Sequence, residues 1–429
     1  MSVHGRENPP KVLIATTIHW ASTTRLALAM VEAGINVAAL APSDHGLHRM
    51  DAIGERRIWS ERSSFARAVL DACHAFRPNL IVPGDDRAVL ALQALYRRHA
   101  GDPTSAIAQA IRASIGDPAF YPVAGRKSAF AAFCRIERLP LPETSLVADA
   151  ATLRAALQTA GFPVVLKVDH SWGGLGVRVA RSEDEALAAL ADLARGYGWR
   201  SSIRRAANGL TAEPLADRMR DGAPAITLQR YVPGLPANSA LVCRAGEVLA
   251  CLVVATVQVA HETGPSTVVR ILDRPDIAAI SARAVRRLGL SGFVGFDFVI
   301  DEATDRPMLI ELNPRPTQTS HFAFDPASDL VGALAASLTG APRRRLAERK
   351  VPELVALFPQ EVWRDPSSRH FRAAYHDVPW SEPQFLSLYA KPVLAERQGW
   401  LTALRRRFRL GAVVAPARGA TVMTEAPIE

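Results

Sequence analysis

Long apolar segments are missing from this sequence of 429 residues, and cysteine is scarce. A helix that crosses a membrane needs a run of about 18 or more apolar residues; the sequence has none, so no membrane-spanning segment is expected. The four cysteines (Cys73, Cys134, Cys243 and Cys251) are far apart, with no C-x-x-C pair and no histidine at metal-ligand spacing. These absences argue against a disulfide framework or a zinc site and favour a reducing compartment.

A signal peptide and a nucleic-acid motif are missing too. The polar, proline-containing start passes straight into a short strand pattern at residues 11–17, so we expect a cytoplasmic protein. The net charge is +9, with arginine runs at 343–345 and 405–409, and such a charge favours acidic partners. No aromatic-interleaved basic motif accompanies these runs, which argues against nucleic acid as a partner.

The sequence is 48% hydrophobic, as expected for a protein of two or three domains with a sizeable core. Residues 1–115 alternate between strand and helix patterns, and this β-α-β-α-β order predicts a doubly wound α/β domain. No G-x-G-x-x-G follows the first strand, so a dinucleotide fingerprint is absent. Asp85 and Asp86 follow a strand, where such folds bind ligands, but capping of the next helix is our preferred interpretation.

Two acids and an asparagine lie in apolar strand patterns near residue 300. Asp297 alternates with phenylalanines, so it lies on the face of its strand opposite to them. In the next apolar run, Glu311 and Asn313 share one face. The polar residues 301–306 connect the two runs, and the pattern predicts an antiparallel hairpin.

The predicted hairpin brings two carboxylates together. If it is centred near Thr304, Asp297 lies directly opposite Glu311, with the side chains about 5 Å apart. Such a pair is destabilising unless a cation lies between its members, and Mg²⁺ suits one or two carboxylates with water and phosphate as further ligands. The alternative is a solvated acidic face on an edge hairpin. Because the flanks are apolar and buried polar groups need partners, we favour a metal site.

A lysine and a glycine-rich loop form a second polar feature. Lys167 lies inside the apolar strand pattern at 163–168, and a buried ammonium is costly unless it is paired. Residues 171–176 contain a serine and three glycines, whose backbone N–H groups can cradle a phosphate. A glycine-rich turn and a lysine that reaches solvent or a protein carboxylate are the structural alternatives.

In this order the features resemble the ATP-grasp superfamily over about residues 1–340. The motifs that carry the resemblance are VVLKVDHSWGGLGV and the run D-F…E-L-N-P-R. The resemblance implies an α/β protein with a Rossmann-like pre-ATP-grasp domain at 1–115 and an ATP-grasp domain at 116–340. Its lid subdomain is expected at about 145–232. A less regular C-terminal extension at 341–429, with a disordered tail, is expected to follow.

The resemblance also implies which residues contact ATP. Lys127 and Lys167 are expected to contact phosphates, and the loop with Ser171, Gly173, Gly174 and Gly176 to close over them. The residues expected beside the adenine are Gln229, Arg230, Tyr231 and Val232. Related proteins often have glutamate where Arg230 stands, and Asn238 takes the place of an acid that reaches the ribose. Both departures bear on nucleotide affinity or choice.

The metal and catalytic residues follow from the same resemblance. Asp297, Glu311 and Asn313 are expected to hold one or two Mg²⁺ ions, with Mn²⁺ as an alternative, and Arg315 to meet the transferring phosphoryl group as the catalytic residue. His321, shortly after Arg315, is a candidate near the acceptor, although an ordinary structural role is preferred for it.

The function implied is an ATP-dependent carboxylate–amine ligase, which forms an acyl phosphate and releases ADP and phosphate. Its partners are small-molecule carboxylate and amine substrates, which the sequence does not identify, and a homodimer stays open. One alternative is an ATP-dependent carboxylase, although no biotin-carrier motif is present. Another is a nucleotide-binding regulatory protein without turnover, against which the intact Asp297 and Glu311 argue.

Overall fold

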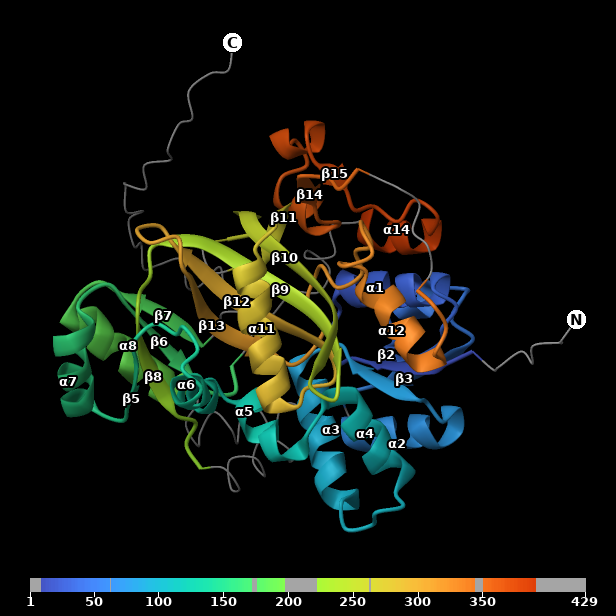
Figure 1. Ribbon diagram of the computed structural model, residues 1–429, viewed down its shortest axis with the longest axis horizontal. Helices are drawn as coiled ribbons and strands as arrows, with labels where there is room; N and C mark the ends of the chain where they lie inside the picture. Colours follow the sequence, from blue (N-terminus) through green and yellow to red (C-terminus); the bar gives the residue numbers. More distant parts are fainter. Residues whose placement is uncertain are drawn as a thin grey trace, which may run out of the picture.

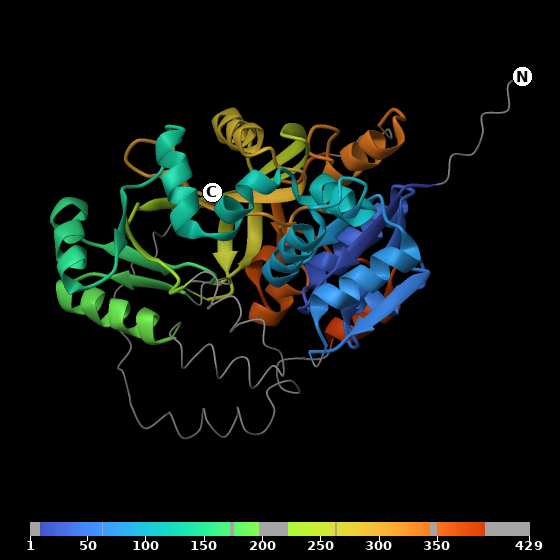
Figure 2. The same ribbon diagram turned by 90° about the horizontal axis from the view of Figure 1, so that it is seen from below.

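The computed structural model describes residues 9–61, 63–171, 176–196, 222–261, 264–343 and 350–390. These residues form two four-stranded sheets and one seven-stranded sheet. The seven-stranded sheet lies between the two smaller ones, as both views show (Figures 1 and 2). The α/β fold expected from the sequence is therefore confirmed.

The N-terminal sheet is parallel and has the order β3-β2-β1-β4. Its strands are β1 (Lys11–Ala15), β2 (Asn36–Pro42), β3 (Glu55–Trp59) and β4 (Leu80–Pro83). One face packs on α1 (Ala21–Glu32), and the other on α2 (Phe65–Phe76), α3 (Asp86–His99) and α4 (Ala106–Ile115). The sequence did not predict β3, because its residues ERRIW are mostly charged and exposed at the edge of the sheet.

The order of the strands in the N-terminal sheet reverses at β1, because β2 and β3 lie on one side of it and β4 lies on the other. Since β2 and β4 flank β1, the loops after β1 and β4 meet at the point where such folds bind ligands. Asp85 joins these loops: its carboxylate accepts from the hydroxyls of Thr16 and Thr17 at 2.9 and 3.0 Å. It also caps α3 through the N–H of Ala88 at 3.1 Å. The predicted helix cap is confirmed for Asp85.

The second four-stranded sheet has the order β5-β8-β6-β7. Its strands are β5 (Thr144–Val147), β6 (Val164–Val168), β7 (Val177–Ala180) and β8 (Ile226–Arg230). The helices α7 (Ala150–Ala160) and α8 (Glu183–Gly196) cover one face, against Val164, Leu166 and Val168. By alternation Lys167 points from the opposite face. The predicted loop at 196–222 lies almost wholly outside the described residues.

The seven-stranded sheet has the order β13-β12-β9-β10-β11-β14-β15. Its strands are β9 (Gly234–Arg244), β10 (Glu247–Val259), β11 (Ser266–Ile271), β12 (Gly292–Asp301), β13 (Pro307–Asn313), β14 (Leu354–Ala356) and β15 (Tyr375–His376). One face packs on α6 (Lys127–Ile136) and α11 (Pro275–Leu288). The other packs on α12 (Leu330–Thr339), whose core also includes α1, so this sheet and the N-terminal domain share one core.

The described part of the C-terminal region continues the large sheet. Strand β14 pairs with β11, and β15 pairs with β14. The short α13 (Gln360–Arg364) follows β14, and α14 (Pro383–Ala390) packs its aromatic residues on the start of α1 (Figure 1). The domain limits drawn from the sequence stay predictions, and the tail predicted to be disordered lies outside the described residues.

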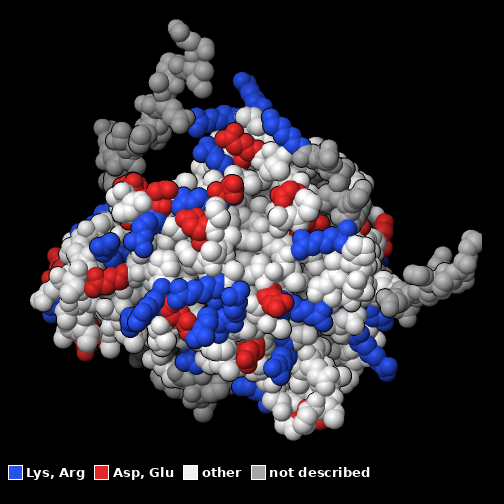
Figure 3. Space-filling view, viewed as in Figure 1, with Lys and Arg blue, Asp and Glu red and all other residues white. Residues whose placement is uncertain are grey.

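Basic side chains gather on the face seen in Figure 3. Arg287 of α11 pairs with Glu137, just after α6, at 2.7 Å. None of the helices in the described ranges is long and apolar enough to cross a membrane.

Candidate functional site

The acid hairpin forms with the register that the sequence predicts. Asp297 of β12 pairs directly with Glu311 of β13, and a β-bulge follows this pair. Asp297 is flanked on its other side by Asn238 of β9. The three polar side chains therefore lie on adjacent strands of the large sheet, and two of them are carboxylates.

Two asparagines hold the carboxylate of Asp297. The Nδ2 of Asn238 donates to Oδ1 at 2.7 Å, and the Nδ2 of Asn313 donates to Oδ2 at 2.8 Å. Burial and the nearby Glu311 raise the pKa of Asp297, although the two asparagines oppose this shift. A positive charge between the acids would relieve their repulsion. In this structure Asn238 contacts the predicted metal site, and its role at the ribose stays a prediction.

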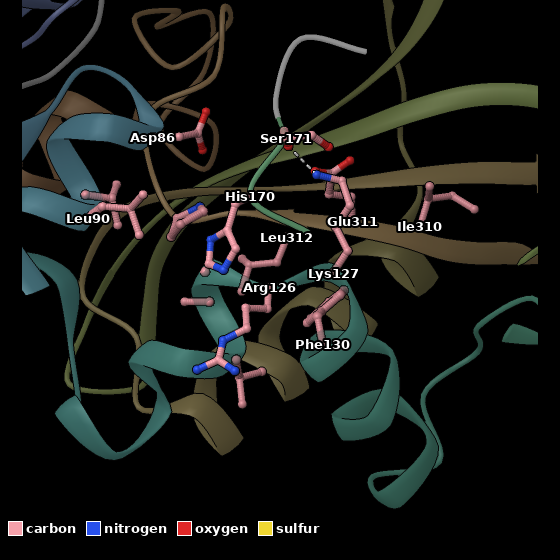
Figure 4. Close-up of a pocket in the computed structure, with 15 residues that line it drawn as sticks. Asp86, Leu90, Arg126, Lys127, Phe130, His170, Ser171, Ile310, Glu311 and Leu312 are labelled. Carbon is pink, nitrogen blue, oxygen red and sulfur yellow. Dashed lines mark hydrogen bonds and ion pairs between the residues drawn. The ribbon is translucent and has the colours of Figure 1, made fainter. Parts of the chain in front are cut away.

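Lys127, the first residue of α6, reaches the second acid. Its Nζ lies 2.9 Å from Glu311 Oε1 and donates to the carbonyl of Ser171 at 2.5 Å (Figure 4). Asp169 holds the start of α6 in place, because it accepts from the N–H of Ser128 at 2.9 Å and from its hydroxyl at 2.5 Å. Lys127 thus connects the end of the lid strand to the acid hairpin.

Lys167 is buried and faces a neutral partner. Its Nζ donates to Gln229 Oε1 at 2.7 Å, and the Nε2 of Gln229 donates to Thr144 Oγ1 at 3.0 Å. Burial lowers the pKa of Lys167 to about 8, with Lys127 acting in the same direction and Glu311 opposing it. These electrostatic contributions place both lysines and both acids in one local group. From the sequence, solvent and a protein carboxylate are the alternative partners of Lys167. In the structure its partner is the side-chain amide of Gln229.

Arg315 joins the hairpin to the N-terminal domain. Its Nε donates to Asp86 at 2.9 Å, its guanidinium lies 4.7 Å from the centre of the Trp20 ring, and Nη2 donates to Asn313 Oδ1 at 3.3 Å. Asp86 therefore forms an ion pair and does not cap α3, so our capping interpretation was wrong for this residue. Asp85 alone caps the helix, because it occupies the N-cap position, from which a side chain reaches the N–H of the third helical residue.

Comparison with known proteins identifies the domain that contains these groups. A family model described as an ATP-grasp domain matches residues 127–319, the segment from Lys127 to just beyond Arg315. Residues 127–319 are therefore an ATP-grasp domain. A relative, the carbamoyl phosphate synthase arginine-specific large chain of Halalkalibacterium halodurans, is 26% identical over 220 residues. The match covers 49% of this chain and 18% of that protein, so the chain spans less than a fifth of the relative's length.

Solved structures share the fold. Carboxyaminoimidazole ribonucleotide synthase from Aspergillus clavatus, complexed with ATP, has a TM-score of 0.54 at 16% identity over 76% of this chain and 77% of that one. The biotin carboxylase domain of 2-oxoglutarate carboxylase from Hydrogenobacter thermophilus, with MgADP and bicarbonate, has a TM-score of 0.55 at 17% identity over 80% and 72%. At these identities the likeness shows the ATP-grasp fold alone.

Only some of the residues that are predicted to bind the nucleotide lie within the described part of the ATP-grasp domain. Gly173 and Gly174 lie outside the described residues. Gly176 is packed so closely that a Cβ there would lie 2.2 Å from Ser171 Oγ, so this position needs glycine. The hydroxyl of Ser171 donates to the carbonyl of Val168 at 2.7 Å, which turns it toward β6.

The segment predicted beside the adenine comprises the last two residues of β8 and the two residues after it. Gln229 contacts Lys167, Arg230 and Tyr231 are exposed, and Val232 is buried. The N–H groups of Arg230 and Tyr231 donate to the carbonyls of Glu143 and Pro163 at 2.8 and 3.2 Å. These two donors are therefore already used, and the part of this segment in binding adenine stays a prediction.

The acids of the ATP-grasp domain suit a hard cation. The described side chains include no cluster of three or more His, Cys, Asp or Glu that would surround a metal by itself. The pair Asp297 and Glu311, with the amide oxygen of Asn313 nearby, provides only oxygen ligands. Mg²⁺ takes such a set because water and nucleotide phosphates complete its shell.

Sequence reasoning missed several residues of this site. Trp20, Asp86 and Arg126 adjoin it from the N-terminal domain and the start of α6. Thr144 at the start of β5 and Asp169 just after β6 support it from the second four-stranded sheet. Asp169 left a local signal, because it stands between the lysine strand and the glycine loop. Asp86 follows a strand end but was assigned to a helix cap, and Arg126 directly precedes Lys127. Trp20 and Thr144 are distant from the motifs in sequence.

The other candidate near Arg315 has a structural partner. His321 is buried, and its Nε2 lies 2.9 Å from Asp377 Oδ2, which in turn pairs with Arg25 of α1. This contact fastens the C-terminal region to the loop after Arg315. The structural interpretation of His321 is confirmed.

Proposed function

We propose that the protein is an ATP-dependent ligase that activates a carboxylate substrate as an acyl phosphate for attack by an amine. The observation that carries this proposal is the opposed pair Asp297 and Glu311, which lies beside Lys127 and Lys167. Two cations beside two acids fit a triphosphate with its metal, because lysine pairs with phosphate and carboxylates hold Mg²⁺. The membership of the ATP-grasp group supports the same chemistry.

Each side chain has a role in this proposal. Lys127 and Lys167 bind ATP phosphates, and in doing so Lys127 exchanges its contact with Glu311 for one with phosphate oxygen. Asp297, Glu311 and Asn313 would hold Mg²⁺, which neutralises charge on the phosphates when it is bound. Arg315, held beside Asn313, lies where it can meet the phosphoryl group in transfer.

The reaction balances without a side-chain nucleophile. A carboxylate oxygen of the substrate attacks the γ-phosphorus, the bond to the β-phosphate oxygen breaks, and ADP leaves. The amine nitrogen then attacks the acyl carbon, loses a proton to solvent and displaces phosphate. Because the acyl phosphate reacts with water, a lid that closes over the site would protect it.

A carboxylase is the second candidate. The biotin carboxylase domain that shares the fold was solved in complex with bicarbonate. Bicarbonate presents the same oxyanion as a carboxylate, so the proposed groups would phosphorylate it in the same way.

A trapping experiment tests the ligase proposal. The protein is incubated with Mg·ATP, hydroxylamine and a panel of amino acids, hydroxy acids and bicarbonate, and ADP and hydroxamate are measured. Hydroxylamine acts as a general amine, so hydroxamate reports acyl phosphate whatever the natural acceptor is. We expect at least one acid to raise both products. If none does so while ATP still binds, the ligase proposal fails and a regulatory protein is favoured.

Two variants of the hairpin make the assignment specific. Glu311→Gln should reduce ADP release by roughly 100-fold or more, since it removes one of two charged metal ligands. Glu302→Gln is the matched control, because Glu302 lies exposed in the turn of the same hairpin. Turnover in folded Glu311→Gln at the rate of the control would overturn the metal assignment.

A further inference from the structure

A cavity opens beside the two-acid site, between the N-terminal domain and the ATP-grasp domain (Figure 4). Lys127 and Glu311 stand at one end of it, and the side chain of Arg126 points away from them, lower in the view. Its other walls are largely apolar, with Leu90 of α3 and Phe130 of α6 among them. The cavity thus has a reactive end, an apolar middle and a second cationic position.

The charges that line the cavity do not balance. Asp86 is paired with Arg315, and Lys127 is paired with Glu311. The guanidinium of Arg126 makes no hydrogen bond or ion pair with any residue that the structure describes, although the residue is half-buried. A guanidinium in such a place is stabilised by an anion, and arginine binds carboxylate or phosphate in a bidentate way.

The backbone gives Arg126 a defined position. It is extended at φ −135° and directly precedes α6, whose first turn Asp169 holds through Ser128. His170, next to Asp169, adopts a left-handed φ of 56°, and its ring lines the same cavity. A ligand group at Arg126 would therefore meet a preorganised cation.

We propose that this cavity binds the substrate of the ligase through a second anionic group, a carboxylate or phosphate held by Arg126. The substrate class is an apolar-bodied molecule with two anionic groups. One is anchored at Arg126, and the other is the carboxylate presented to the γ-phosphoryl group near Lys127 and Glu311. The inference rests on the proposed function only for the carboxylate presented to the γ-phosphoryl group, since binding of an anion at Arg126 needs no turnover.

The apolar walls select the body of the molecule. Leu90, Val123 and Phe130 come from three different helices, and such a lining favours hydrocarbon over a second phosphate chain. A diacid without an apolar group would leave the apolar surface of these walls in contact with water. The cavity therefore favours diacids that carry an alkyl or aryl group over diacids without one.

Calorimetry with matched acids tests the proposal. Binding is measured in the presence of Mg·ADP for three pairs of a monoanion and its dianion. The pairs are hexanoate and adipate, 3-phenylpropanoate and phenylsuccinate, and 3-phenylpropanoate and 3-phenyl-3-phosphonopropanoate. We expect the dianion to bind roughly 10- to 100-fold more tightly than its monoanion, as one charge-assisted hydrogen-bonded pair provides. The phosphonate arm distinguishes a phosphate anchor from a carboxylate anchor. If no dianion binds more tightly than its monoanion, the proposal is rejected.

Arg126→Gln should remove this preference while Mg·ADP affinity stays within about twofold, and Arg126→Lys should restore part of it. Arg138→Gln is the matched control, because Arg138 is exposed just after the other end of α6. Equal weakening of Mg·ADP and of the dianions in Arg126→Gln would overturn the proposal and assign Arg126 to the nucleotide. An unchanged preference in that variant would also overturn it.

The ligase proposal fails separately. If dianions bind in an Arg126-dependent way and yet form no hydroxamate with Mg·ATP and hydroxylamine, the anion site stands and the ligase does not. If hydroxamate forms from monoanions alone and Arg126→Gln makes no difference, the ligase stands and the anion site does not.

Discussion

Lys167 provides a prediction whose size follows from the structure. Burial lowers its pKa from 10.5 to about 8, and its hydrogen-bond partner, Gln229, is neutral. A shift of roughly 2.5 units corresponds to about 3 kcal/mol of unfolding free energy. Below pH 8 the lysine is protonated in both the folded and the unfolded state, so the folded state is destabilised by the full free energy of burying the ammonium. As the pH rises from 8 to 10.5, the folded state loses the proton first, and folding becomes more favourable.

Lys167→Met isolates this effect. Methionine fills a similar volume and does not titrate, so the difference in stability between wild type and variant should change by about 3 kcal/mol between pH 7 and pH 10.5. The wild type gains relative to the variant. The lost hydrogen bond to Gln229 costs about 1–3 kcal/mol, but this cost is the same at every pH and cancels. The other groups that titrate in this range are common to both proteins.

Urea unfolding or thermal melting of both proteins at pH 7, 8, 9 and 10.5 measures the difference. A difference that stays flat with pH would refute the reasoning, because it would mean that the ammonium is not desolvated in the folded protein. Saturating Mg·ADP provides the second arm. If phosphate contacts Lys167, it raises the pKa of this lysine in the folded state. The free energy of unfolding of the wild type should then rise less steeply with pH, and Lys167→Met should lose most of the stabilisation by nucleotide.

Two further substitutions test the packing around the hairpin. Asp86→Ala should lower the free energy of unfolding by about 1–3 kcal/mol, because Arg315 loses its partner in a mostly buried place; an unchanged urea midpoint would contradict this. Gly295→Ala should be destabilising by about 1–3 kcal/mol, because its Cβ would lie 2.2 Å from the Cγ2 of Thr317. The double variant with Thr317→Ser, which removes that methyl group, should recover most of the loss in thermal melting, and no recovery would assign the cost to the backbone.

The acid hairpin was predictable because its determinants are local. A period of two places Asp297 and Glu311 on one face, and a short connection sets their register. The lysine strand of the lid was predictable for the same reason. Each prediction used fewer than 20 consecutive residues, and within such a length alternation and turn residues decide the structure.

The partners of these residues were not predictable. Arg315 and Asp86 are 229 positions apart, and Lys167 and Gln229 are 62 apart. Whether such residues meet depends on how helices pack on sheets, which alternation does not encode. Asn238 shows the same limit. The resemblance assigned it to the ribose, which stays a prediction, and the sequence did not foresee that β9 pairs with β12 and places Asn238 beside Asp297.

The contacts of Arg315 argue that the proposed reaction site belongs to both domains. Asp86 begins the helix after β4, at the edge of the N-terminal sheet where its order reverses. Through Arg315 this edge touches Asn313, which itself holds Asp297. The shared core of α1 and α12 keeps the two sheets in this relation. A molecule that enters between the domains therefore meets side chains of both, and changes in either domain are expected to alter which substrate is accepted.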